Sequence, residues 1–403
     1  MKILIVSQYY KPVKAAASKR MGKVAHWLNG KGFDVTVLTG MASYPTGIVP
    51  AQYQGKLSFK EEIDGIKIHR TYEYPAANSG FIKRILNYLS FTFSASWAIL
   101  TGPYYDIVIV TSPPIFTGIA GLTARWFRKS KFIFDVRDLW PDSALEAGMI
   151  KPGLVANVME KMEKSFYKNA QKITTATANI KEHLKKEGWP TNKVQVLMNT
   201  VDTDKFKPKK IGRKKYGFTP DDFILAYTGN HGIAQDLDTF IKIANELKDN
   251  PRIKFLFVGE GEVKQKLQAI TDELKLKSVT FWPEQEPEKI IEIINLADMG
   301  IISLNKGKIF QQAIPTKSSE YFSCGKPVIA TVSGELKKYI DKYNVGFAIT
   351  GKDIKKGARV ILRLAKNKKM HLQMSKNARQ LALQTFSDKV FFRNIARLIN
   401  ELS

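Results

Sequence analysis

Residues 223–238 read FILAYTGNHGIAQDLD and give the clearest indication of the fold class. The apolar run Phe223–Tyr227 has the length and composition of a strand buried on both faces of a parallel sheet. The loop after it contains Gly229, Asn230, His231 and Gly232, and a helix is expected from Asp238. Glycines in such a loop let backbone N–H groups approach a phosphate, and the start of the helix adds partial positive charge. We therefore interpret the loop as a phosphate-binding turn, with an ordinary strand-to-helix turn as the alternative.

The same alternation of strands and helices extends in both directions. Apolar runs with strand character lie at 3–6, 35–38, 66–70, 107–110, 132–136, 173–176, 194–197, 255–258, 279–281, 299–303 and 328–331. A polar and basic stretch, 201–215, separates an earlier series from a later one. The pattern predicts an α/β protein with two doubly wound Rossmann-like domains that face each other across a cleft. We expect an N-terminal domain at 1–204, a C-terminal domain at 205–385, and a last helix at 386–403 that packs back on the N-terminal domain.

Composition excludes several classes of protein. The 403 residues are 44% hydrophobic and 25% charged, which is typical of globular proteins and not of disordered ones. Cys324 is the single cysteine, so the sequence has neither a disulfide scaffold nor a cysteine-based metal cluster. The five histidines lack the spacing of metal ligands, and the triplet Asp202-Thr203-Asp204 suits a turn or a cap. We therefore expect no metal site.

The formal net charge is +26, and the halves 1–200 and 201–403 contribute +13 each. A positive field spread over the chain favours anionic partners, namely nucleotides, lipid diphosphates, acidic membrane surfaces or nucleic acid. A nucleic-acid-binding protein would concentrate lysine and arginine, with interleaved aromatic residues, on one domain. The even distribution argues against that class.

A second motif, Pro315-Thr316-Lys317-Ser318-Ser319-Glu320-Tyr321, opens a helix in the later series. Lys317 and Glu320 are three residues apart and therefore share one face of that helix. The ammonium can neutralise a diphosphate, and the carboxylate can accept hydrogen bonds from two adjacent ribose hydroxyls; a surface ion pair is the alternative. Gly259, at the turn after the strand 255–258, can line a nucleoside pocket or simply form a tight turn.

The earlier series offers two groups at the ends of expected strands. The run 132–136 is followed by Arg137 and Asp138, and the carboxylate of Asp138 can orient or deprotonate a sugar hydroxyl. An Arg–Asp pair that stabilises the loop is the alternative interpretation. After the first strand come Ala16, Ala17 and Ser18, small residues that permit close approach of a ligand.

A stretch without charged residues, 85–105, has the length of a membrane span. Its asparagine, serine and threonine residues and the break at Gly102-Pro103 argue against a span. Two interpretations remain open. The segment is either a helix half-buried in protein or one whose Phe91, Phe93 and Trp97 contact a bilayer.

Four motifs occur in a fixed order along nearly the whole chain. They are the start 8–18 with Gln-Tyr-Tyr-Lys-Pro and its small-residue loop, Val136–Pro141, Gly229–Gln235 and Pro315–Tyr321. In this combination the chain resembles a retaining glycosyltransferase of the GT-B fold in glycosyltransferase family 4. More narrowly, it resembles the bacterial O-antigen and capsule transferases related to N-acetylfucosaminyl transferases.

The resemblance implies transfer of a sugar from a nucleoside diphosphate donor, with UDP and an N-acetylated or deoxy sugar favoured. The implied acceptor is a lipid-diphosphate-linked saccharide in surface polysaccharide assembly. Lys317 and Asp138 are the expected catalytic residues. Lys317 stabilises the departing diphosphate, whose oxygen removes the acceptor proton, and Asp138 orients the acceptor. No metal or other cofactor is required in this mechanism.

The resemblance also assigns binding roles. The donor side comprises Gly229, Asn230, His231, Gly232, Gly259, Lys317 and Glu320, and the acceptor side comprises Ala16, Ala17, Ser18, Arg137 and Asp138. The chain departs from the family where an arginine, a lysine and an acidic residue are replaced by Asn230, Gln235 and Gln312. A histidine with which the N-terminal domain usually contacts the donor sugar has no counterpart. Lys317 and backbone N–H groups near Gly229 and Gly232 should therefore make the contacts to phosphate.

The apolar block 3–6 is too short for a signal peptide, and with such an acceptor we expect a cytoplasmic protein held peripherally at the inner face of the cell membrane. The segment 79–105 and basic residues would contact the anionic surface, and no nucleic acid partner is expected. Three alternatives remain. They are a non-hydrolysing nucleotide-sugar epimerase, a DNA-modifying GT-B protein, and a sugar-binding relative without catalytic activity.

Overall fold

The computed structural model describes residues 1–403 except 78–80, 147, 149, 305–313, 350–352 and 403. The chain divides into two compact units: unit 1 comprises Met1–Met198 and Phe392–Ser403, and unit 2 comprises Asn199–Phe391. The predicted boundaries, after residues 204 and 385, lie close to these divisions. Each unit has its own sheet and its own hydrophobic core.

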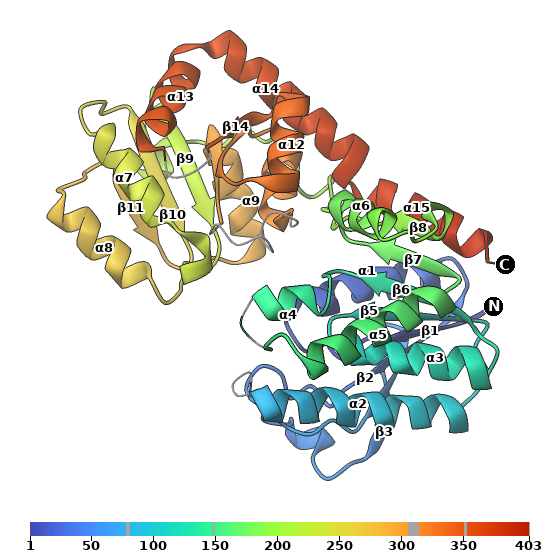
Figure 1. Cartoon of the computed structure of the whole chain (residues 1–403). Helices are drawn as coiled ribbons and strands as arrows, with labels where there is room; N and C mark the ends of the chain where they lie inside the picture. Colours follow the sequence, from blue (N-terminus) through green and yellow to red (C-terminus); the bar gives the residue numbers. More distant parts are fainter. Residues whose placement is uncertain (78–80, 147, 149, 305–313, 350–352, 403) are drawn as a thin grey trace. The chain divides into compact units, whose positions relative to one another are not determined.

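Unit 1 is built on an eight-stranded sheet with the order β3-β4-β2-β1-β5-β6-β7-β8 (Figure 1). Neighbouring strands are parallel apart from β3 and β4, which form an antiparallel hairpin. The strands are β1 (Lys2–Val6), β2 (Asp34–Thr39), β3 (Ser58–Ile63), β4 (Ile66–Thr71), β5 (Ile107–Ser112), β6 (Lys131–Val136), β7 (Lys172–Thr175) and β8 (Val194–Val196). The strand order reverses at β1, and ligands of such sheets bind beyond the carboxyl ends of the strands near that point.

The helices of unit 1 are α1 (Ala16–Gly30), α2 (Phe81–Thr101), α3 (Gly118–Phe127), α4 (Asp142–Glu146), α5 (Leu154–Asn169) and α6 (Ala178–Lys186). The last helix, α15 (Asp388–Asn400), contributes its second half to this unit. Phe392 stacks on Trp27 of α1 with 5.3 Å between ring centroids. Gln195 Nε2, next to β8, donates a hydrogen bond to the Asn394 carbonyl at 3.0 Å. These contacts attach the end of the chain to the N-terminal sheet.

Helix α2 contains most of the uncharged segment for which the sequence allowed two interpretations, a helix half-buried in protein or a helix that contacts a bilayer. Phe91, Ala95 and Ile99 recur every four residues and are buried in the core of unit 1. The interpretation that Phe91 contacts a bilayer is therefore wrong, because helical spacing turns it toward the sheet. Phe93 and Trp97 lie on other faces of the helix and are 66% and 67% exposed. Within the described residues, no helix combines the length with the hydropathy that a bilayer crossing requires.

Unit 2 is built on a six-stranded parallel sheet with the order β11-β10-β9-β12-β13-β14. The strands are β9 (Phe223–Thr228), β10 (Ile253–Val258), β11 (Val279–Trp282), β12 (Met299–Ser303), β13 (Val328–Thr331) and β14 (Gly346–Ala348). The helices are α7 (Asp238–Glu246), α8 (Lys264–Glu273), α9 (Pro287–Leu296), α11 (Thr316–Ser323), α12 (Gly334–Tyr343), α13 (Ile354–Lys366) and α14 (Lys368–Leu381). The strand order reverses at β9.

The predicted fold class is confirmed, since both units are α/β with Rossmann-like parallel sheets. The central strands are buried apolar runs because helices cover both faces of the sheet; Ile224–Tyr227 of β9 are fully buried. Sequence reasoning missed two strands, the three-residue β14 and the edge strand β3. The β3 residues SFKEEI alternate between exposed and half-buried and include three charges, which is typical of an edge strand and carries little hydrophobic signal.

Candidate functional site

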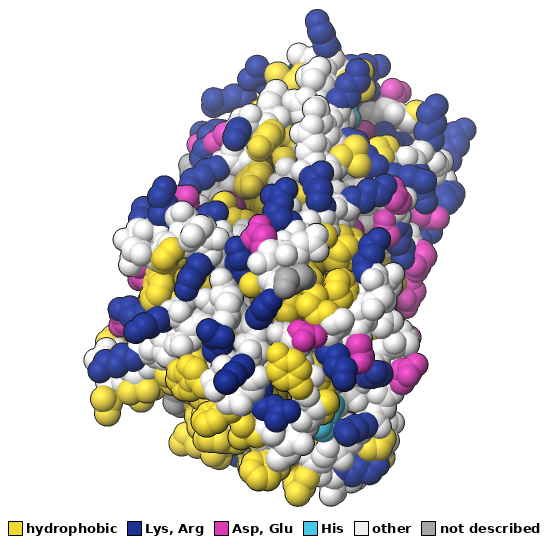
Figure 2. Space-filling model, turned by 90° about the vertical axis from the view of Figure 1, so that its right-hand side faces the viewer, with side chains coloured by type: hydrophobic (Ala, Val, Ile, Leu, Met, Phe, Trp, Pro, Cys, Tyr) yellow, Lys and Arg dark blue, Asp and Glu magenta, His cyan; other side chains and the backbone are white. Residues whose placement is uncertain are grey.

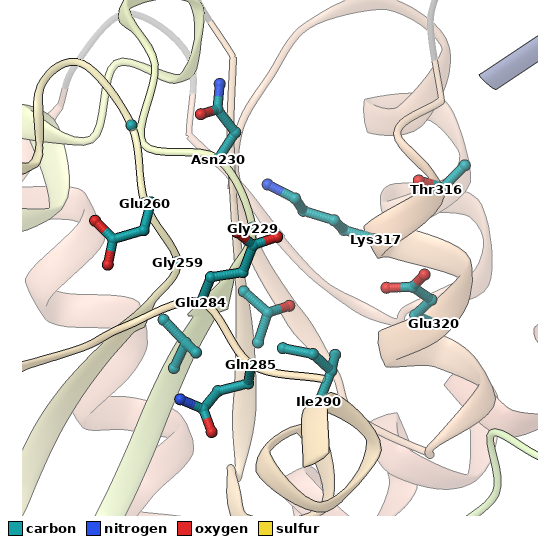
Figure 3. A pocket seen from close by; sticks show the side chains of 13 residues that line it. Gly229, Asn230, Gly259, Glu260, Glu284, Gln285, Ile290, Thr316, Lys317 and Glu320 are labelled. Atoms are coloured by element: carbon teal, nitrogen blue, oxygen red, sulfur yellow. The ribbon is translucent and has the colours of Figure 1, made fainter. Parts of the chain in front are cut away.

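A pocket of about 460 Å³ lies in unit 2 at the carboxyl ends of β9 and β10 (Figure 3). Cavities of this size hold small-molecule ligands. Its walls are Thr228, Gly229 and Asn230 after β9, Val258, Gly259, Glu260 and Gly261 after β10, Glu284, Gln285 and Ile290 after β11, and Thr316, Lys317 and Glu320 of α11. The structure thus brings five of the predicted donor residues, Gly229, Asn230, Gly259, Lys317 and Glu320, to one pocket.

Close packing of two turns explains the glycines of this pocket. Gly229 has a φ of +127°, and a Cβ atom there would lie 2.6 Å from Cε of Lys317. Gly259 has a φ of +141°, and its Cβ would lie 2.1 Å from the carbonyl oxygen of Gly229. The positive φ disfavours any other residue at both positions, and at Gly259 the neighbouring backbone also leaves no space for one. Backbone atoms therefore form this wall of the pocket, as a phosphate-binding turn requires.

Lys317 is held in place by Tyr227, a residue that sequence reasoning treated only as the end of a strand. Lys317 Nζ donates a hydrogen bond to Tyr227 Oη at 2.5 Å and lies 3.9 Å from the centroid of the tyrosine ring. Tyr227 Oη in turn donates to the Asn230 carbonyl at 2.7 Å. The ammonium is thereby fixed above the turn that contains Gly229.

The environment of Lys317 favours an anionic ligand. Burial lowers the pKa of Lys317 to about 8, and attraction to Glu320 opposes this shift. An anion bound beside Nζ would raise the pKa again, because a nearby negative charge favours the protonated form. Figure 3 shows the Lys317 and Glu320 side chains extending from α11 to the same side, into the pocket. The prediction from their spacing, that they share one helix face, agrees with this arrangement.

The wall opposite α11 contains residues that the sequence did not reveal. Glu284, Gln285 and Ile290 come from the segment after β11. The position of this segment could have been predicted, because the carboxyl ends of neighbouring parallel strands lie at one edge of a sheet. The segment lacks the glycines or the lysine that marked the other turns. Glu260, also in the wall, forms an ion pair with Lys264 at 2.6 Å.

Two predicted donor residues, His231 and Gly232, do not line the pocket. The His231 ring is fully buried beside Tyr227, Phe257 and Phe281, with ring centroids 5.6, 6.4 and 6.3 Å away. Burial lowers its pKa to about 4, and the charges of two nearby lysines act in the same direction. The imidazole is therefore neutral at pH 7.

The loop that carries these residues is braced from within the chain. The His231 backbone N–H donates to the Glu260 carbonyl at 2.8 Å, which joins the turns after β9 and β10. Gly232 N–H donates to Gln235 Oε1 at 3.1 Å. Gln235, at the position where the family resemblance implies a lysine, thus caps its own loop. Gln312, the third departure, lies outside the described residues.

The predicted acceptor residues all lie in unit 1, at the carboxyl ends of its strands. Ala16, Ala17 and Ser18 form the first turn of α1, and the last two are buried. Arg137 and Asp138 follow β6 directly; Arg137 is half-buried and Asp138 is exposed.

An ion pair that sequence reasoning missed joins α1 to β6. Arg20 Nη2 lies 3.0 Å from Asp135 Oδ1, and both side chains are buried. The hydroxyls of Thr111 and Thr174 donate to the same carboxylate at 2.9 and 2.7 Å. Burial alone would raise the pKa of Asp135, but the guanidinium and these hydrogen bonds hold it below its ordinary value. The alternative interpretation of Arg137 and Asp138, a pair that stabilises the loop, is not what the structure shows, because within the described residues these two side chains form no ion pair.

The described part of the chain contains no group of three or more histidine, cysteine, aspartate or glutamate residues arranged to hold a metal ion. Whether the reaction requires a metal is a separate question, and its independence of metal stays a prediction.

Two family models match successive parts of the chain. A glycosyl transferase 4-like domain matches residues 16–200, and the glycosyl transferases group 1 model matches residues 208–381. The chain is a GT-B glycosyltransferase of family 4. The predictions of the family and of transferase activity are confirmed, and the matches favour the transferase over the epimerase and the DNA-modifying protein.

Individual relatives agree with this assignment. The glycosyltransferase is 23% identical, over 82% of its length and 83% of the relative's, to the putative colanic acid biosynthesis glycosyl transferase WcaI of Escherichia coli K12. HepE of Anabaena in complex with UDP matches with a TM-score of 0.73 at 14% identity, covering 100% of both chains. Sucrose-phosphate synthase of Thermosynechococcus elongatus matches with a TM-score of 0.73 at 14% identity, over 100% of this chain and 98% of the other. At these identities the two structures show the common fold.

Proposed function

We propose that this glycosyltransferase transfers a sugar from a UDP-linked donor, with retention of the anomeric configuration, to a lipid-diphosphate-linked saccharide during assembly of a surface polysaccharide. The convergence of Lys317 and Glu320 on a pocket with a glycine backbone wall is the observation that carries this proposal. The similarity to WcaI, a putative transferase of colanic acid biosynthesis, supports a role in polysaccharide assembly. The N-acetylated or deoxy sugar that the family resemblance implies stays a prediction.

The donor fits the pocket by charge and by hydrogen-bonding pattern. The Lys317 ammonium and the backbone near Gly229 suit a diphosphate, and the Glu320 carboxylate suits the paired hydroxyls of a ribose. Asn230 adds a neutral polar group where relatives place an arginine. The UDP complex of HepE, which has the same fold, supports UDP as the nucleotide.

In the proposed reaction, the bond between the anomeric carbon and the diphosphate oxygen breaks while the acceptor hydroxyl forms a bond on the same face. The proton of that hydroxyl passes to the departing diphosphate oxygen. Lys317 stabilises the negative charge that develops on the diphosphate, in a site where burial strengthens the interaction. Asp138 of unit 1 orients the acceptor hydroxyl through its carboxylate and forms no covalent intermediate.

The acceptor's lipid places the protein at a membrane, and unit 1 has a surface suited to it. Ile82, Phe93 and Trp97 of α2 are exposed, as are Trp126 and Phe127 at the end of the adjacent helix α3. Helix α2 contains two basic residues and no acidic one. Figure 2 shows hydrophobic side chains, with Lys and Arg among them, over the lower part of the view, which is the level of α2 in Figure 1. We propose that this surface binds the anionic inner face of the cell membrane.

An acceptor-dependent assay tests the proposed reaction. The protein is incubated with a panel of UDP-sugars and polyprenyl-diphosphate-linked saccharides, and UDP release and the anomeric configuration of the product are measured. We expect UDP release that requires the acceptor and a product with the donor's configuration. An inverted product, or UDP release that no lipid-linked acceptor accelerates, would contradict the proposal.

A further inference from the structure

Arg137 carries a positive charge that forms no ion pair with any residue that the structure describes. Its Nε atom is buried and has no hydrogen-bond partner in the described structure. Among the described residues, the guanidinium of Arg137 also forms no ion pair. The backbone N–H of Arg137, by contrast, donates a hydrogen bond to the Ser112 carbonyl. A buried donor without a partner is costly, so this arrangement needs an explanation.

The two neighbouring carboxylates, Asp135 and Asp138, do not pair with the Arg137 guanidinium. Asp135, the buried carboxylate nearby, is already bonded to Arg20 and to two threonine hydroxyls. Asp138 is exposed and is not within ion-pair distance of Arg137. The charges of Asp135 and Asp138 do act on Arg137, but burial outweighs them and lowers its pKa, and Arg20 adds repulsion. Among the described residues, the guanidinium of Arg137 is therefore left without a paired carboxylate.

We propose that Arg137 binds the diphosphate of the lipid-linked acceptor, an inference that rests on the function proposed above. A guanidinium presents several N–H groups in a planar fork that matches the oxygens of a phosphate, and such charge-assisted bonds are the strong ones. The position, directly after β6 at the carboxyl edge of the sheet, is where ligands of this fold class bind. The exposed Ile82 at the start of α2 suits the lipid to which the diphosphate is attached, because this part of α2 lies toward the same edge of the sheet, where Asn87 is bonded to Gln8 beyond β1.

The test measures binding of farnesyl diphosphate to the full chain by calorimetry, with UDP at saturating concentration to occupy the pocket of unit 2. We expect Arg137→Gln to weaken this binding about tenfold to a hundredfold, since a charge-assisted hydrogen bond is lost. Arg137→Lys should be intermediate because it keeps the charge and loses the fork. Inorganic pyrophosphate should show the same dependence on Arg137 at lower affinity, and farnesol should show none.

A matched control separates a specific site from the general positive field. Arg125→Gln removes one exposed guanidinium from α3 in the same unit and should leave farnesyl diphosphate binding unchanged. Equal affinities of the wild-type protein and Arg137→Gln, equal losses in the two variants, or no binding by the wild-type protein would each overturn the inference.

Binding of UDP distinguishes this inference from the proposed function. Arg137→Gln should bind UDP as the wild-type protein does. A matching loss of UDP affinity would assign Arg137 to the donor and overturn the inference, whereas failure of the wild-type protein to bind UDP would overturn the proposed function itself. Because the Arg137 side chain has no hydrogen-bond or ion-pair partner in the part of the chain that the structure describes, its replacement should leave the melting temperature nearly unchanged.

Discussion

The charged groups at the carboxyl ends of the strands are arranged differently in the two units. In unit 2, backbone atoms of two glycine turns and the Lys317 ammonium, held by Tyr227, line one pocket. In unit 1, the main charged groups, Arg20 and Asp135, neutralise each other in the interior, and Arg137 is left over. The difference indicates that unit 2 is organised around a small anionic ligand, whereas the ion pair of unit 1 mainly fixes its framework.

Removing the ammonium group of Lys317 in unit 2 should have the largest effect on the rate of UDP release. Lys317→Ala should lower the rate of UDP release about a thousandfold, since the negative charge of the transition state develops beside this group. Initial rates measured at saturating UDP-sugar check this expectation. The matched control is Lys266→Ala, which removes an exposed lysine of α8 in the same unit and should retain the wild-type rate. A rate for Lys317→Ala within threefold of wild type would remove Lys317 from the mechanism.

The buried ion pair between Arg20 and Asp135 should contribute to the stability of unit 1. Arg20→Met leaves Asp135 buried without its counter-charge and should lower the free energy of unfolding of unit 1 by about 3–5 kcal/mol, measured by urea denaturation. Lys67→Met breaks an exposed pair with Asp34 in the same sheet and should leave the free energy of unfolding nearly unchanged. Equal losses in the two variants would show that Arg20 does not fix the framework.

The apolar surface of unit 1 should affect membrane binding moderately. The double variant Phe93→Ser, Trp97→Ser should reduce co-sedimentation with vesicles of phosphatidylglycerol and phosphatidylcholine about tenfold at low salt, because two exposed aromatic side chains are lost. Leu372→Ser, which replaces an exposed leucine on α14 of unit 2, serves as the control. Sedimentation of the double variant at the wild-type level would exclude α2 as the contact.

Donor affinity should depend on pH through Lys317, and this effect should be the smallest. The pKa of Lys317 is lowered to about 8 by burial, so the free protein loses the ammonium as the pH rises through that value. An anionic donor binds the protonated form, so KM for the UDP-sugar should rise severalfold between pH 7 and pH 9. Constant KM over this interval would contradict the role of Lys317 in donor binding.

The fold could be predicted from the sequence because apolar runs and helical spacing recur with little interruption. The role of the pocket glycines was also predictable, since tight turns after strands favour the positive φ values that Gly229 and Gly259 adopt. Local spacing likewise indicated that Lys317 and Glu320 act together.

The features that were missed depend on contacts between residues far apart in the chain. Tyr227 and Lys317 are separated by 90 residues, and Arg20 and Asp135 by 115, so no local pattern connects them. His231 shows the opposite error. A polar residue in a phosphate-type loop suggested a ligand contact, but the ring is buried beside Phe257 and Phe281.

The most direct test of the account is calorimetric titration of UDP into the wild-type protein, Lys317→Ala and Glu320→Gln. The account predicts one UDP site per chain, with affinity reduced at least tenfold in each variant, because the ammonium contacts the diphosphate and the carboxylate contacts the ribose. Equal UDP affinity in all three proteins would contradict it.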